Sequence, residues 1–262
     1  MKIRVLGCHG SDQLVSSNGS MLSCRPCSFL INDSILIDAG TIGSKLTLDE
    51  QLKIRHILLS HLHFDHIKEL PTLADNRSGT PGPPVTLASI APVVEGLRTH
   101  IFNWQVYPNF FSLPSEKEPV FTSQVLQLGA ASKVADLSII PIAVNHSVPT
   151  VGFVIDDGHA AVLYSGDTYE TEELWRVAAS IPHLKAAFIE VSYPNREASL
   201  AFEAKHLTPS LFLKEFRKLR RPDLPVYLYH MKPRFRRQIE EEIGRLGIDC
   251  ATLLEEDRLI SL

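Results

Sequence analysis

Short apolar segments bounded by turn-forming residues recur through the first sixty residues. The segments 2–6, 27–31 and 34–38 are β-branched or apolar and are flanked by Gly, Asn and Asp, a pattern typical of strands joined by tight turns. A helical stretch at 47–53 precedes the continuous apolar run 56–60, which is expected of a strand buried on both faces. The pattern predicts an N-terminal antiparallel meander followed by a buried strand.

The remainder of the chain repeats this order of strands and helices. We expect a helical segment at 67–74, an exposed Gly- and Pro-rich loop at 75–84, a strand at 85–89 and a helix at 91–101. The second half predicts strands at 137–145, 151–155, 160–165, 186–191 and 226–230, and helices at 170–179, 209–219 and 234–246. Because the two halves look alike, the α/β chain is expected to form a four-layer αββα sandwich, two mixed sheets face to face with helices outside.

The aromatic stretch 102–111 shows neither the helical nor the strand periodicity of apolar residues. We interpret it as core packing beneath a loop, with a substrate lid as the alternative.

Length and composition favour one compact domain over residues 1–262. With 44% hydrophobic and 21% charged residues the chain can bury a large core. We expect neither a signal peptide nor a membrane-spanning stretch, and therefore a cytoplasmic protein. The net charge of −4 disfavours nucleic acid as the main partner. The four cysteines, Cys8, Cys24, Cys27 and Cys250, are interpreted as reduced thiols, since Cys24 and Cys27 have no second CxxC to complete a structural zinc site.

Histidines concentrate directly after the buried strand 56–60. His61, His63, Asp65 and His66 lie within six residues. Each buried imidazole needs its own hydrogen-bond partner away from water, whereas bound metal satisfies all of these groups together. Imidazole and carboxylate suit zinc, iron or manganese. This spacing favours a metal site over its alternative, a histidine-rich turn on the surface.

The segment 61–66 resembles the H-x-H-x-D-H motif of the metallo-β-lactamase superfamily. Three later residues also match that family. His146 matches the third histidine ligand, Asp167 matches the carboxylate of the S/T-G-D-T turn, and His230 matches the last ligand, at the end of a late strand. Asp38 matches a family position whose carboxylate fixes the orientation of the ligating histidines. The alternative is an ordinary aspartate in a turn at the end of a strand.

The resemblance implies a dinuclear centre. One metal would be bound by His61, His63 and His146, and the other by Asp65, His66 and His230, with Asp167 between them. Two such ions, about 3.5 to 4 Å apart, can lower the pKa of a shared water toward about 7 and clamp the anionic oxygens of an in-line displacement. We expect two divalent metal ions, zinc before manganese or iron.

The segment 204–209 narrows the substrate, because His206 and Lys205 precede a helix that has Thr208 as its cap and Pro209 as its first residue. Together with 27–31, 57–61 and 229–233, it resembles class II cyclic-nucleotide phosphodiesterases and their bacterial relatives. The resemblance implies hydrolysis of 3′,5′-cyclic nucleotides, cyclic AMP or cyclic GMP, to 5′-monophosphates. Asp65 and His206 are the expected catalytic residues, and His206 would be the general acid or would orient the phosphate. Lys205 and His206 would bind the substrate.

Other interpretations remain open. His206 could be a helix-entry histidine bonded to backbone, and the cations Lys232, Arg234, Arg236 and Arg237 could meet phosphate, although a solvated helix face is favoured for them. The enzyme could instead be an RNA-processing phosphodiesterase related to ribonuclease Z, or a lactone or thioester hydrolase. A non-catalytic nucleotide sensor is a further class. We expect a small-molecule phosphodiester as the substrate and a homodimer as the default assembly.

Overall fold

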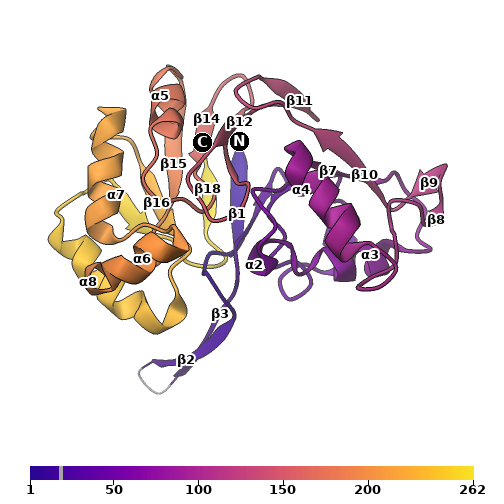
Figure 1. Ribbon diagram of the computed structural model, residues 1–262, viewed down its shortest axis with the longest axis horizontal. Coiled ribbons are helices and arrows are strands. Elements are labelled where there is room, and N and C mark those ends of the chain that lie inside the picture. Colours follow the sequence, from indigo (N-terminus) through magenta and orange to yellow (C-terminus); the bar gives the residue numbers. More distant parts are fainter. Residues whose placement is uncertain (18–19) are drawn as a thin grey trace.

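Two seven-stranded mixed sheets form the centre of the molecule, which a computed structural model describes over residues 1–17 and 20–262 (Figure 1). The first sheet contains β1 (Lys2–Gly7), β4 (Ser28–Ile31), β5 (Ile35–Ile37), β6 (His56–Leu58), β7 (Val85–Ser89), β10 (Phe121–Val125) and β18 (Leu259–Ser261). Its strand order is β10-β7-β6-β5-β4-β1-β18. Strands β1, β4 and β5 pair antiparallel, which confirms the predicted meander, whereas β5, β6, β7 and β10 run parallel.

The second sheet holds its strands in chain order. They are β11 (Ser132–Val134), β12 (Leu137–Ala143), β13 (Val151–Asp156), β14 (Ala161–Tyr164), β15 (Leu184–Glu190), β16 (Val226–Tyr229) and β17 (Ala251–Leu253). The first four pair antiparallel, and β14 to β17 run parallel. The carboxyl ends of β14, β15 and β16 therefore lie side by side, and polar residues follow each of them.

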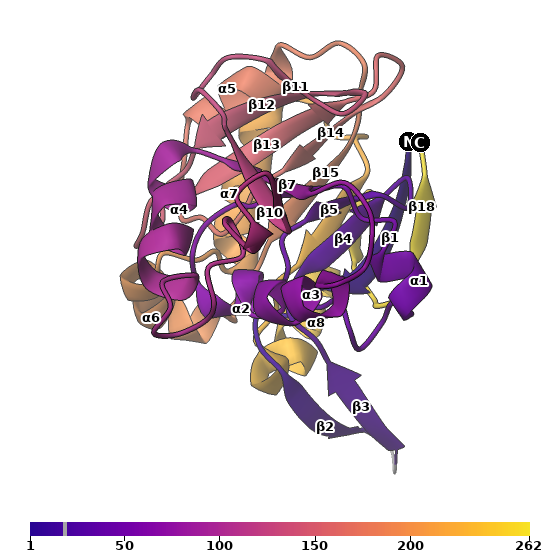
Figure 2. The same cartoon turned by 90° about the vertical axis from the view of Figure 1, so that its right-hand side faces the viewer.

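Helices cover the outer faces of both sheets (Figures 1 and 2). On the side of the first sheet lie α1 (Leu48–Gln51), α2 (Phe64–Ile67), α3 (Leu70–Arg77) and α4 (Ala91–Gly96), which continues into the π-helical turn η1 (Leu97–Ile101). On the side of the second lie α5 (Glu173–Ala179), α6 (Ala198–Ala204), α7 (Pro209–Phe216) and α8 (Arg236–Arg245), with the 3₁₀ turns η2 (Asn195–Glu197), η3 (Arg217–Leu219) and η4 (Pro233–Phe235). The predicted four-layer αββα sandwich is confirmed.

Aromatic side chains fill the space between the sheets. Phe29 of β4 meets Tyr164, Phe188 and Tyr229 of the second sheet, with ring centroids 5.7, 5.7 and 5.6 Å apart. The Tyr164 hydroxyl then donates to Asp38 of the first sheet at 2.7 Å. Edge-to-face packing and this cross-sheet hydrogen bond fix the strand ends of one sheet against those of the other.

A two-stranded hairpin, β2 (Gln13–Ser17) and β3 (Ser20–Cys24), projects from the body (Figures 1 and 2). The sequence did not predict it, because its strands mix polar and apolar residues and leave Leu14 and Met21 exposed. A second small hairpin pairs β8 (Pro114–Ser115) with β9 (Glu118–Pro119).

The segment around the aromatic stretch departs partly from expectation. Helix α3 runs on to Arg77, so the predicted loop at 75–84 begins three residues late. Phe102, Phe110 and Phe111 are buried in the core, as predicted, whereas Trp104 is exposed.

All four cysteines are free thiols, and Cys8, Cys24 and Cys27 are buried. None of the helices in the described part of the chain combines the length and apolar character needed to cross a bilayer.

Candidate metal centre

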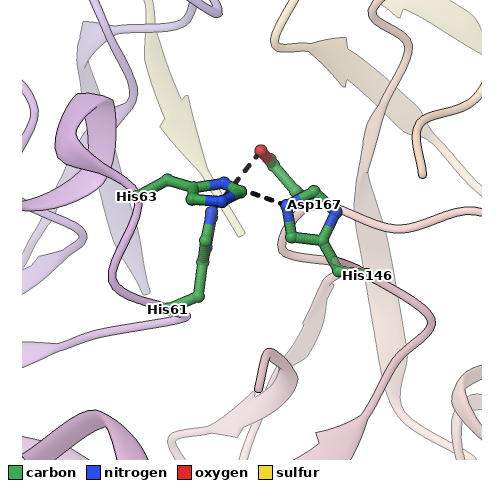
Figure 3. A group of neighbouring side chains, drawn as sticks. All are labelled: His61, His63, His146 and Asp167. Carbon is green, nitrogen blue, oxygen red and sulfur yellow. Dashed lines mark hydrogen bonds and ion pairs between the residues drawn. The ribbon is translucent and has the colours of Figure 1, made fainter. Parts of the chain in front are cut away.

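Seven histidine and aspartate side chains converge where the strand ends of the two sheets meet. They fall into two groups, within each of which the ligand atoms lie no more than 4.8 Å apart: His61, His63, His146 and Asp167 in one, and Asp65, His66 and His230 in the other. A third, overlapping group joins Asp167 and His230 with His206. Figure 3 shows the first group, with His61 and His63 pointing from the first sheet toward His146 and Asp167 of the second. The structure thus brings together all seven residues singled out from the sequence.

The turn after β6 aims its residues alternately into this space. His63 is the N-cap of α2, in extended conformation, and the His66 amide donates to the His63 carbonyl at 2.9 Å. The His66 carbonyl accepts from the Ala39 amide at 2.7 Å, which ties the turn to the strand end of β5. On the opposite side, His230 follows β16 at a φ of 69°, a left-handed conformation rare for a non-glycine residue. This reversal turns its ring inward.

Asp38 organises the histidines of the first sheet. Its carboxylate accepts from the Ser60 amide, the Ser60 hydroxyl, the Tyr164 hydroxyl and Nδ1 of His66. Because the Ser60 hydroxyl donates to Asp38, it accepts from Nδ1 of His61, 2.9 Å away. In their neutral form both histidines therefore carry their proton on Nδ1 and direct the Nε2 lone pair to the centre.

The second sheet repeats this arrangement with a buried glutamate. The Glu190 carboxylate accepts from the Ser192 hydroxyl at 2.8 Å, so the Ser192 oxygen accepts from Nδ1 of His230, also at 2.8 Å. Nδ1 of His146 donates to the Lys205 carbonyl at 3.0 Å. His146 and His230 therefore also turn an unprotonated Nε2 inward.

Two pairs of ring nitrogens face each other inside the cluster. Nε2 of His66 lies 3.3 Å from Nε2 of His230, and Nδ1 of His63 lies 3.1 Å from Nε2 of His146. Nδ1 of both His66 and His230 is bonded elsewhere, so the lone pairs of the two facing Nε2 atoms repel unless a cation, either a proton or a metal ion, lies between them. The donor arrangement therefore fits bound metal ions.

Two further atoms support this fit. Nε2 of His61 and Oδ1 of Asp167 are fully buried and have no hydrogen-bond partner among the described residues. Unpaired buried polar atoms are costly and uncommon in folded proteins. Coordination to a cation would satisfy both.

The charges of the cluster are strongly coupled. Burial disfavours the imidazolium of His66, but the charges of Asp167 and Asp38 outweigh it and hold the pKa of His66 well above its usual range. Burial lowers the pKa of His230 to about 4, even though Asp167 opposes this shift. Asp167 itself has a pKa well below the usual range, because His230 and His66 outweigh the effect of burial. Asp167 is thus the carboxylate anion that a shared cation would require.

His206 lies beside the cluster, where the sequence predicted it. Its ring centroid is 5.1 Å from those of His146 and of His230, and its Nδ1 donates to Glu190 at 2.8 Å. The alternative of a histidine bonded through its ring to backbone does not hold, because its partners are the side chains of Glu190 and Ser192. Burial lowers the pKa of His206, but Glu190 reverses the effect and raises it.

Glu190 and Ser192 were missed by the sequence analysis. Both are fully buried, and Glu190 also accepts from the Thr168 amide at 3.0 Å, so it links three elements of the centre. The available signal was a carboxylate near the end of the apolar segment 186–191, a position like that of Asp38 after the strand Ile35–Ile37.

The four late cations do not behave alike. Arg236 and Arg237 pair with glutamates on and near α8, and Arg234 covers the Phe235 ring, as a solvated face predicts. Lys232 differs: its ammonium donates to the Gly10 carbonyl at 2.8 Å and lies 3.8 Å from Asp65. The prediction that all four belong to a solvated helix face is therefore wrong for Lys232, which lies before α8 at the edge of the cluster.

Comparison with known proteins agrees with the geometry. A family model described as a β-lactamase superfamily domain matches residues 34–231. A protein of Yersinia pestis named "Probable 3′,5′-cyclic-nucleotide phosphodiesterase" is 29% identical over 208 residues, which are 70% of this chain and 58% of that protein. The chain thus spans little more than half the length of this relative.

Two solved structures share the fold over their whole length. The metallo-β-lactamase fold protein YhfI from Bacillus subtilis superposes with a TM-score of 0.77 at 15% identity, covering 99% of both chains. Unliganded yeast PDE1 superposes with a TM-score of 0.80 at 18% identity, covering 100% of this chain and 99% of that one. With the family match extending from β5 to the residue after His230, the chain belongs to the β-lactamase superfamily domain family and has the metallo-β-lactamase fold.

Proposed function

We propose that this protein is a metal-dependent phosphodiesterase that hydrolyses 3′,5′-cyclic nucleotides, cyclic AMP or cyclic GMP, to nucleoside 5′-monophosphates. The observation that carries the proposal is the hydrogen bond between Glu190 and His206 at the rim of the histidine cluster. An alkoxide leaving from a phosphodiester needs a proton, and this pair places a proton donor beside the cluster. The 29% identity to the Yersinia protein supports the same substrate class.

The seven clustered side chains would hold two divalent metal ions. His61, His63 and His146 would bind one ion, and Asp65, His66 and His230 the other, with Asp167 shared between them, in keeping with the two groups of ligand atoms. Zinc is the first expectation, and manganese or iron would accept the same donors. When bound, such a pair supplies an activated water and neutralises charge on the phosphoryl oxygens.

His206 would act as the general acid. Nδ1 is committed to Glu190, so the proton available for transfer is the one on Nε2. That nitrogen has no hydrogen-bond partner among the described residues, and it is not completely shielded from solvent. Glu190 stabilises the imidazolium and keeps the ring in one orientation, so His206 can give its Nε2 proton to the leaving oxygen.

Asp65 and Lys205 would complete the site. Burial opposes ionisation of Asp65, but the neighbouring His230 ring, 3.4 Å away, and His66 lower its pKa, so it stays an anion facing the cluster. Lys205 precedes His206 and adds a cation at the rim that would attract a phosphodiester anion.

The test is turnover by the metal-loaded protein of cyclic AMP, cyclic GMP, bis(p-nitrophenyl) phosphate, a lactone and a thioester. We expect both cyclic nucleotides to be cleaved. His206→Ala should lower kcat for them by about 10²- to 10⁴-fold, yet affect bis(p-nitrophenyl) phosphate much less, because p-nitrophenolate leaves without a proton. Metal content should stay the same.

The matched control is His183→Ala. His183 is also bonded to a carboxylate, that of Asp156 at 2.9 Å, but it is a half-exposed residue outside the cluster. This variant should retain turnover. Cleavage of the lactone or thioester with cyclic nucleotides left intact would contradict the proposal. If a precursor RNA, supplied as a further substrate, were cleaved and the cyclic nucleotides were not, the RNA-processing alternative would be favoured. Binding of cyclic nucleotide without turnover would favour a sensor.

A further inference from the structure

An aromatic and cationic cluster adjoins the metal centre on the side of α6. It consists of Tyr169, Phe202 and Lys205, and none of the three is a candidate metal ligand. The Tyr169 and Phe202 ring centroids lie 5.6 Å apart at 81°, and the Lys205 ammonium lies 4.1 Å above the Phe202 ring and 5.5 Å from the Tyr169 ring. We refer to these three residues as the aromatic platform.

Backbone contacts fix the aromatic platform to the centre. The Lys205 carbonyl accepts the hydrogen bond that orients His146, and Lys205 directly precedes His206. The Tyr169 amide donates to the carbonyl of Asn145, the residue before His146, at 2.7 Å. The platform therefore borders the cluster through residues that themselves position two of its histidines.

Helix α6 ends in a backbone conformation that favours glycine. Lys205 closes α6 in the left-handed region, at φ 58° and ψ 54°, where glycine is the usual residue. A non-glycine residue held there carries some conformational strain, as Arg220 does at the end of η3. The strained turn places the Lys205 carbonyl on His146, while its ammonium covers the two rings.

The platform is also open to a ligand. The Phe202 side chain is 54% exposed, and Tyr169 and Lys205 are half-buried. The Lys205 ammonium lies over the two rings. A planar aromatic group could stack on Phe202, while the same ammonium attracts an anion.

We propose that the aromatic platform is the subsite for the nucleobase of a nucleoside phosphate whose phosphate occupies the metal centre. This inference rests on the proposed function for the identity of the ligand. It adds Phe202 and Tyr169 as the residues that select a substrate carrying an aromatic base over a phosphodiester that lacks one.

The test compares two ligands that are not turned over, 5′-AMP and ribose 5-phosphate, by titration calorimetry on the metal-loaded protein. They share the sugar phosphate and differ in the base. Stacking of one base changes affinity by about 5- to 150-fold, so we expect 5′-AMP to bind more tightly than ribose 5-phosphate by a factor in that range. Phe202→Ala should bring the ratio of the two dissociation constants close to one, while the constant for ribose 5-phosphate stays the same.

Two variants keep this test decisive. Phe202→Tyr retains a ring and should keep the ratio. Leu128→Ala truncates a comparably exposed apolar side chain, 50% exposed, in the turn between β10 and β11, and should keep it too. If the platform is only local packing, Phe202→Ala would lower the unfolding temperature and leave the ratio as in the unaltered protein, which overturns the proposal.

The outcome is separate from that of the proposed function. A base preference that depends on Phe202, in a protein that cleaves no cyclic nucleotide, would support the platform and reject the reaction. Cleavage of cyclic nucleotides with equal affinity for 5′-AMP and ribose 5-phosphate would support the reaction and reject the platform.

Discussion

The carboxylate of Asp38 lies 2.7 Å from Nδ1 of His66, and both side chains are fully buried. The Asp38 carboxylate accepts four hydrogen bonds, from the His66 ring, the Ser60 amide, the Ser60 hydroxyl and the Tyr164 hydroxyl. It therefore sets the proton position of His66 directly and that of His61 through Ser60.

The first prediction concerns this arrangement. Asp38→Asn should weaken metal affinity by about 10- to 100-fold, because an amide group would turn a donor toward groups that are themselves donors. Competition with a chelator of known affinity measures the change. Asp33→Asn is the matched control: Asp33 has a similar positive φ, 59° against 56° for Asp38, but it is exposed and should leave affinity unchanged. Equal loss in both variants would contradict the role of Asp38.

The second prediction concerns the pH dependence of turnover. Glu190 raises the pKa of His206 against the effect of burial, so the protonated acid persists to higher pH in the unaltered protein than it would alone. In Glu190→Gln the pKa of His206 should fall, and the descending limb of the profile of kcat against pH should move to lower pH. Glu203→Gln, on the exposed side of α6, should keep the original profile. An unshifted limb in Glu190→Gln would reject His206 as the acid.

The third prediction concerns close packing behind the centre. A Cβ atom at Gly40 would lie 2.1 Å from the Asp65 carbonyl oxygen and 2.8 Å from that of Cys27. Gly40→Ala should therefore lower the free energy of unfolding by about 1 to 3 kcal/mol and reduce metal content, because the turn that carries Asp65 must move. Gly244→Ala in α8 meets no atom within 4 Å and should be neutral or stabilising by up to about 1 kcal/mol. Denaturant unfolding and metal analysis of both variants test this contrast.

The fourth prediction concerns acid stability. Burial opposes ionisation of Glu256, but hydrogen bonds from His9, Lys45 and Arg25 lower its pKa to about 2, from 4.5. The folded state thus binds this proton less readily than the unfolded state does. The resulting stabilisation is fully present above pH 4.5 and is lost as the pH falls through 2. Glu256→Gln should remove this part of the pH dependence, measured as unfolding free energy between those pH values, whereas Glu255→Gln, its exposed neighbour, should not.

The sequence predicted most of the centre because its residues stand where apolar runs end. His61 to His66 follow a buried strand, and Asp167 and His230 follow two more. The hydrophobic pattern and the polar residues therefore both indicated a site at the strand ends. Glu190 stood in a matching position and was missed, since a single carboxylate at a strand end has no motif to mark it. Its role depends on Ser192 and His206, which only the folded chain places beside it.

The hydrophobic pattern also made most of the fold predictable. It was less informative where strands that are distant in the sequence pair with each other. β18 joins the first sheet through the pair Ile3 and Ile260, although the strand before it, β17, belongs to the second sheet. Three-residue strands carry too little pattern to reveal such a crossing. The β2–β3 hairpin was missed because its strands bury little apolar surface.

The ligand set draws on both sheets, with four residues carried by the first and three by the second. Metal ions bound there would link the two sheets to each other, in addition to the packing of Phe29 against Tyr164 at the interface between the sheets. A substitution that loosens the packing at Phe29 should therefore weaken metal retention as well as lower the free energy of unfolding, although Phe29 is not itself a ligand.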